Sequence, residues 1–142
     1  MTDGWWIITC DVPRGSTPGA WVVGWLPKGH RHLWLARRID DGTDDSQQLW
    51  HILDPASYGL LAVVGLFDGD YVASKVAQGC TAALVPIAHN PARAYPRGWM
   101  TCVAMAKYVT GFRAWWACTP RMLIREAARR GCKVVYPCST QN

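Results

Sequence analysis

Short hydrophobic runs alternate with polar turns along this chain, and two stretches show helical spacing with helix-ending signals. Runs rich in β-branched and aromatic residues predict strands at 5–10, 20–26, 30–38, 48–54, 59–67, 80–88 and 133–136. Apolar spacing and capping residues predict helices at 71–78, 101–110 and 119–130. No repeat or composition shift divides residues 1–142. We expect a single domain of the α+β class, in which an antiparallel sheet packs on two or three helices.

Two consecutive predicted strands flank the polar turn at 40–46 and predict an antiparallel hairpin. If the turn centres near Thr43, His32 lies opposite Asp54. Directly opposed residues share one face of a sheet, with Cβ atoms about 4.5–5.5 Å apart. We therefore expect an imidazole and a carboxylate side by side at the open end of the hairpin, and His51 on the other face.

The predicted helix at 101–110 carries a cysteine in its first turn. Thr101 is the expected N-cap, and Gly111 is the expected glycine that ends the helix. Free backbone N–H groups and the helix dipole at this end can lower the pKa of a thiol, which makes Cys102 a candidate nucleophile. Cys102 also lies on the apolar face of the helix, so a core position is the alternative.

The predicted helix at 119–130 bears a basic stripe, formed by Arg121, Arg125 and Arg129 at i, i+4 spacing. Such a stripe is typical of a solvated face, and only this stripe favours nucleic-acid binding. Fifteen Lys and Arg against ten Asp and Glu give a net charge of +5, which is a mild basic bias. We therefore expect no nucleic-acid partner.

Half of the residues are apolar and 18% are charged, a composition typical of a globular domain with a core. The clearest apolar run, at 59–67, is far shorter than the roughly 18–20 residues that span a membrane. The first residues lack the basic and apolar regions of a signal peptide. We expect a protein that is made in the cytoplasm, with no membrane span.

Six cysteines are present, and none of them forms a C-x-x-C motif. Without an export signal, reduced thiols are expected. No Cys/His spacing is typical of a zinc site, so we predict neither a metal nor a cofactor. A metal shared by His30, His32 and His89 is the weaker alternative.

Nucleophilic acyl transfer needs a nucleophile, a base and a group that orients the base, and Cys102, His32 and Asp54 supply these three roles. His30 lies on the same predicted strand face as His32 and competes for the role of base. Cys118, beside the start of the last helix, is a rival nucleophile. The residues that we expect to bind substrate are Trp34, Trp50, Trp99 and Thr101.

Three residues resemble a known site in their placement and order. They are a histidine at the start of one strand (His32), a polar residue at the end of the next (Asp54) and a cysteine at a helix start (Cys102). The order is similar to the circularly permuted branch of the papain-like cysteine hydrolases, relatives of the NlpC-type cell-wall endopeptidases. Segments 49–55 and 101–120 are also similar to small phage-type proteins of that class. Thr101 departs from the pattern, because a polar or acidic residue usually precedes the cysteine.

The resemblance covers roughly residues 30–125 and implies an amidase or endopeptidase that needs no cofactor. Peptide or peptidoglycan bonds would be its substrates, with Cys102 as nucleophile, His32 as base and Asp54 as orienter. A phage origin would add structural proteins of the virion as partners and the virion as a location.

A catalytically inactive structural or binding protein on the same fold, such as a virion component, is the second hypothesis. Nine tryptophans favour it, because tryptophan is enriched at protein interfaces. A hydrolase predicts a perturbed Cys102 thiol beside an open groove. A structural protein predicts a buried Cys102 and an apolar tryptophan patch that partners cover.

Overall fold

The computed structural model describes residues 4–11, 30–39, 47–56, 59–87 and 101–138. The elements of these residues are β1 (Gly4–Cys10), β2 (His32–Ile39), β3 (Gln47–Ala56), β4 (Gly59–Asp68), α2 (Tyr71–Ala77), β5 (Thr81–Pro86), α3 (Cys102–Thr110), α4 (Pro120–Arg129) and β6 (Lys133–Val135). The predicted strand at 20–26 lies outside the described residues. All the other predicted elements are present, within about two residues of their expected ends.

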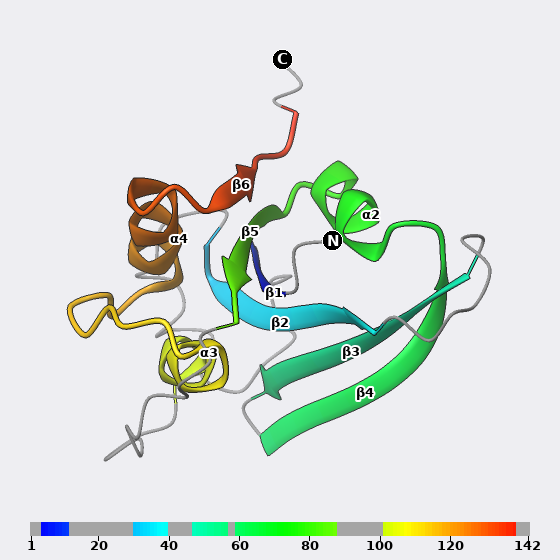
Figure 1. Cartoon of the computed structure of the whole chain (residues 1–142), viewed down its shortest axis with the longest axis horizontal. Helices are drawn as coiled ribbons and strands as arrows, with labels where there is room; N and C mark the ends of the chain where they lie inside the picture. Colours follow the sequence, from blue (N-terminus) through cyan, green and yellow to red (C-terminus); the bar gives the residue numbers. More distant parts are fainter. Residues whose placement is uncertain (1–3, 12–29, 40–46, 57–58, 88–100, 139–142) are drawn as a thin grey trace.

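The six described strands form one sheet in the order β4-β3-β2-β1-β5-β6, and every neighbouring pair is antiparallel (Figure 1). The three described helices pack against this sheet, so the predicted α+β class is confirmed. Figure 1 shows α3 and α4 close together and α2 at a distance from them. None of the described helices has the length and apolarity needed to cross a membrane.

The sheet has a hydrophobic cluster on each face, because successive strand residues point to opposite sides. Leu33 and Leu35 of β2 join the cluster formed with α3 and α4, which we call the α3-side cluster. Trp34 and Ala36 of the same strand join a second cluster together with Tyr71 of α2, which we call the α2-side cluster. Each face of β2 therefore belongs to a different core.

The ends of α3 form as the sequence predicts. The Thr101 hydroxyl accepts a hydrogen bond from the Ala104 N–H at 3.1 Å, which caps the first turn. Gly111 ends the helix in the left-handed region with φ of 67°, where a side chain would be strained. These two signals fix Cys102 as the first residue of the helix.

The register of the β2–β3 hairpin differs from the predicted one by two residues. Leu35 pairs with Leu53 and Ala36 with Ile52, so the hairpin centres near position 44 instead of Thr43. A shift of two residues leaves every side chain on its predicted face, because the side-chain period of a strand is two. Asp54 therefore shares a face with His32, as diagonal neighbours instead of directly opposed residues.

Candidate functional site

His32 and Asp54 form a hydrogen-bonded pair at one end of the β2–β3 hairpin. The His32 Nε2 atom lies 2.6 Å from Asp54 Oδ1, and their side chains are 26% and 33% exposed. The imidazole also stacks on Trp34, with ring centroids 5.9 Å apart. Because Asp54 engages Nε2, Nδ1 is the ring nitrogen left for proton transfer with another group.

Cys102 is half-buried and packs against the α3-side cluster. Backbone N–H groups of Val103, Cys102 and Leu33 interact with its sulfur. Burial nevertheless raises the pKa of the Cys102 thiol, because desolvation of the thiolate outweighs the stabilisation by these three donors. The shift is opposite to the one that a helix start alone favours, and the resting thiol stays protonated at neutral pH.

The thiol and the imidazole lie near the first residues of β2, on opposite faces of the sheet. Leu33, whose backbone N–H acts to lower the pKa of the Cys102 thiol, directly follows His32, and the charge of Asp54 acts to raise the same pKa. The imidazole lies on the α2 side with Trp34, whereas Cys102 belongs to the α3 side. The β2–β3 pairing starts only at Leu35, so the end of β2 is not paired to β3 where the two groups approach it.

No hydrogen bond joins His32 to Cys102 among the residues that the structure describes. Catalytic hydrogen bonds are often long or poorly aligned in a resting site and shorten when substrate binds. The structure therefore brings His32 and Asp54 into direct contact and places Cys102 beside the backbone that follows His32.

His30, the competing base, and Cys118, the rival nucleophile, both have contacts away from Asp54. His30 lies with its Nδ1 atom 2.9 Å from the Thr9 hydroxyl, and burial followed by the charge of Arg121 lowers its pKa. His32, and not His30, is thus the histidine that contacts Asp54. Cys118 is exposed, and its Sγ donates a hydrogen bond to the Trp116 carbonyl at 3.5 Å.

Of the residues expected to bind substrate, the two tryptophans that the structure describes are buried and do not line a groove. Trp34 and Trp50 are 8% and 3% exposed and form part of the α2-side cluster. They are core residues because α2 covers their face of the sheet. Thr101 is exposed and caps α3 with its hydroxyl, and Trp99 lies outside the described residues.

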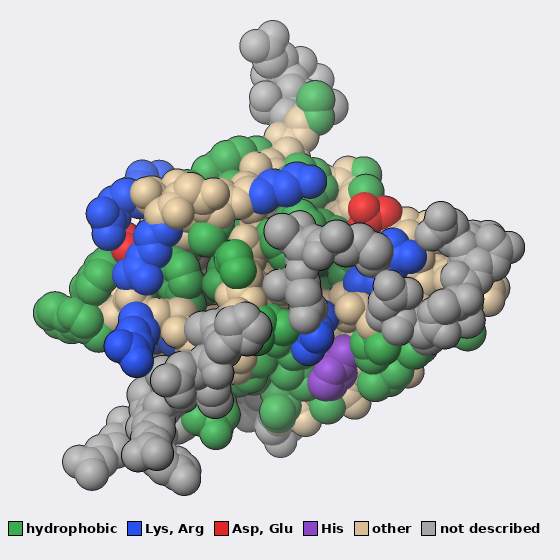
Figure 2. All heavy atoms as spheres, viewed as in Figure 1, with side chains coloured by type: hydrophobic (Ala, Val, Ile, Leu, Met, Phe, Trp, Pro, Cys, Tyr) green, Lys and Arg blue, Asp and Glu red, His purple; other side chains and the backbone are tan. Residues whose placement is uncertain are grey.

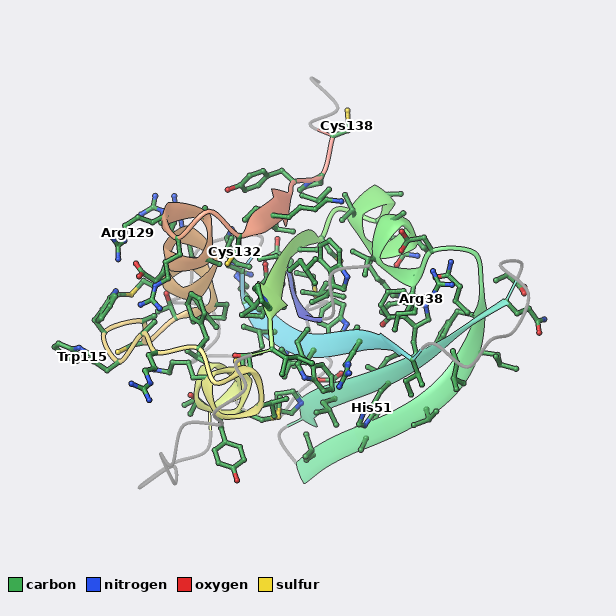
Figure 3. All side chains as sticks on the ribbon, in the orientation of Figure 1. Arg38, His51, Trp115, Arg129, Cys132 and Cys138 are labelled. Carbon is green, nitrogen blue, oxygen red and sulfur yellow. The ribbon has the colours of Figure 1, made fainter. Side chains whose placement is uncertain are left out.

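Cys10 borders the site without a sequence signal that singles it out, whereas His51 lies on the opposite face of the sheet, as predicted. Cys10 of β1 pairs directly with His32 across the β1–β2 ladder, so it shares the face of the His32–Asp54 pair. His51 points to the α3 side of β3, where its ring lies 5.5 Å from that of Trp5 (Figure 3). The β1–β2 pairing joins segments that are distant in the sequence. A local sequence pattern does not specify such a pairing.

The part of the chain that the structure describes contains no cluster of three or more His, Cys, Asp or Glu side chains that could hold a metal ion. Comparison with protein-family models, with curated proteins and with solved structures finds no match for this chain.

Proposed function

We propose that this chain is a cysteine hydrolase that cleaves peptide or amide bonds, with the peptides of peptidoglycan as the substrate class to test first. Cys102, His32 and Asp54 would act in the circularly permuted papain-like arrangement. The observation that carries the proposal is the 2.6 Å contact between His32 and Asp54, next to Leu33, whose cluster Cys102 packs against. A histidine oriented by a carboxylate, beside a thiol at a helix start, has the parts required for acyl transfer.

In the proposed reaction, His32 Nδ1 takes the thiol proton as the sulfur attacks the carbonyl carbon of the substrate. The backbone N–H of Cys102 donates to the oxyanion that forms. Asp54 stabilises the imidazolium, which then protonates the leaving amine, and water hydrolyses the thioester. Because burial raises the pKa of Cys102, proton removal accompanies the attack instead of preceding it. Because His32 and Cys102 lie on opposite faces of the sheet, the reaction requires the two groups to come into contact around the end of β2 that is not paired to β3.

A second candidate, a non-catalytic assembly component, has its own support in β4. This strand lies at the edge of the sheet that the described strands form, and its sequence from 60 to 67 holds no charged residue. Its exposed large side chains are Leu60, Leu61, Val63, Val64 and Leu66, each 38–57% exposed. Figure 2 shows hydrophobic side chains gathered on the lower right, where Figure 1 places β3 and β4. An apolar edge strand of this kind is a template for pairing with another chain.

Hydrolysis assays with variant proteins test the first candidate. The substrates are short peptides with a fluorogenic amide and soluble stem peptides of peptidoglycan. We expect Cys102→Ala to abolish cleavage and His32→Ala to reduce it about 10²–10⁴-fold, as for loss of a general base. Cys118→Ala and His51→Ala are the matched controls, and both should retain activity. Cleavage by Cys102→Ala at the wild-type rate would refute the proposal.

Sedimentation measurements separate the second candidate from the first. An assembly component that cleaves none of these substrates should form oligomers at raised concentration, and Val64→Lys should return it to the monomer. Val64 is 57% exposed, so the lysine itself can be solvated in the monomer without disturbing the core.

A further inference from the structure

Cys10 and Cys80 both adjoin the α2-side cluster, at the end of the β1–β5 ladder. The last pair of this ladder is Thr9 with Thr81, and its register continued by one residue brings Cys10 opposite Cys80. Opposed residues of antiparallel strands have Cα atoms about 4.5–5.5 Å apart, within the range of about 4.4–6.8 Å that a disulfide spans.

Backbone hydrogen bonds hold both cysteines in this position. Gly79, with φ of 94°, lies in the turn that follows α2, and the N–H of Cys80 then donates to the Lys75 carbonyl at 3.1 Å. On the other strand, the Cys10 carbonyl accepts a hydrogen bond from the Arg31 N–H at 2.9 Å. The backbone at both positions is therefore fixed before any covalent bond forms.

The two thiols also interact with each other. Burial, with a contribution from the neighbouring Cys80, raises the pKa of Cys10 to about 12. Burial raises the pKa of Cys80 as well, but the charge of Lys75 and the hydrogen bond with Cys10 oppose that rise. The charge of Lys75 and this hydrogen bond therefore favour Cys80, and not Cys10, as the thiol that loses its proton.

We propose that Cys10 and Cys80 form a reversible intramolecular disulfide when the protein meets a peroxide. The Cys80 thiolate attacks one peroxide oxygen and the O–O bond breaks, which gives a sulfenic acid and a hydroxide. The Cys10 sulfur then attacks the Cys80 sulfur, the S–O bond breaks, and water leaves with the Cys10 proton. In total, two thiols and one hydrogen peroxide give one disulfide and two waters.

The disulfide would form beside the candidate site, because Cys10 is also the direct cross-strand partner of His32. Its formation does not depend on catalysis by Cys102. Four other cysteines provide internal comparison, and two of them, Cys118 and Cys138, are exposed. Figure 3 labels Cys138 near the C-terminal end of the ribbon, far from β1.

Peptide mapping of the wild-type chain is the direct test. The full-length protein is treated with hydrogen peroxide, blocked with N-ethylmaleimide and digested without reduction. We expect one cross-linked peptide pair that joins Cys10 to Cys80, loss of two of the six thiols, and their recovery with dithiothreitol. Cys10→Ser and Cys80→Ser should each abolish the cross-link, whereas Cys118→Ser and Cys138→Ser should retain it.

Two results would overturn the proposal. One is that Cys10 and Cys80 both carry the maleimide after peroxide treatment while Cys118 or Cys138 is oxidised. The other is a cross-link from Cys10 to any cysteine except Cys80. Both results come from the wild-type protein, so the test does not require the serine variants to fold.

Discussion

Replacement of Thr110 by valine tests how the end of α3 is held in place. Thr110 is 2% exposed, and its hydroxyl donates to the Ala106 carbonyl at 2.7 Å and accepts from the Phe112 N–H at 3.2 Å. Valine has nearly the same shape but makes neither bond. The Phe112 N–H, in a buried residue, would then lose this acceptor.

The size of the effect follows from those two bonds. Each intramolecular hydrogen bond contributes about 0.5–1.5 kcal/mol net, so we expect Thr110→Val to lower the free energy of unfolding by about 1–3 kcal/mol. For a chain of 142 residues, this corresponds to a fall in Tm of roughly 2–4 °C for each kcal/mol. Thr110→Ser keeps the hydroxyl and loses one methyl group, so it should cost only about 0.8 kcal/mol.

Urea unfolding followed by circular dichroism measures both variants, and amide hydrogen exchange reports on Phe112 directly. We expect the Phe112 amide to exchange faster in Thr110→Val than in Thr110→Ser. A valine variant as stable as the wild type, or a serine variant less stable than the valine variant, would refute the stabilising role of the Thr110 hydroxyl.

Three further substitutions test other parts of the fold. Hydrogen bonds from Arg129, together with Arg130, lower the pKa of Glu126 from 4.5 to about 2. This carboxylate therefore stabilises the fold above pH 4.5, and the stabilisation is lost as the pH falls towards 2. Urea midpoints should therefore show Glu126→Gln less stable than wild type at pH 7, with the difference vanishing near pH 2. Gly111→Ala, at φ of 67°, should cost about 1–2 kcal/mol in the same assay, and an unchanged midpoint would contradict the left-handed conformation. Leu35→Ala removes a fully buried side chain of β2 and should cost about 2–5 kcal/mol, which thermal unfolding would detect.

The elements of this fold could be predicted because their signals are local. Thr101 and Gly111 bound α3 through hydrogen-bond capacity and backbone freedom, which depend on neighbouring residues only. The face of each residue in β2 and β3 could be predicted as well, since side chains alternate with a period of two. His32 and Asp54 lie together for this reason, even though the register is shifted by two residues.

The remaining features depend on tertiary packing that no local pattern specifies. Trp34 and Trp50 are core residues because α2 covers their face, and a strand pattern does not show which face a distant helix will cover. The pKa of Cys102 is raised because the whole of α3 is packed on the sheet, whereas the sequence shows only the helix start. Cys10 lies beside His32 because of a long-range strand pairing.

The central claim, that His32 serves as the base for Cys102, is tested most directly by alkylation at neutral pH. Iodoacetamide labelling is followed by site mapping in the wild type, in His32→Ala and in His51→Ala. The resting thiol is protonated, so a base is needed to assist its attack. We predict that labelling of Cys102 slows at least about tenfold in His32→Ala and is unchanged in His51→Ala. Equal rates of Cys102 labelling in all three proteins would contradict the account.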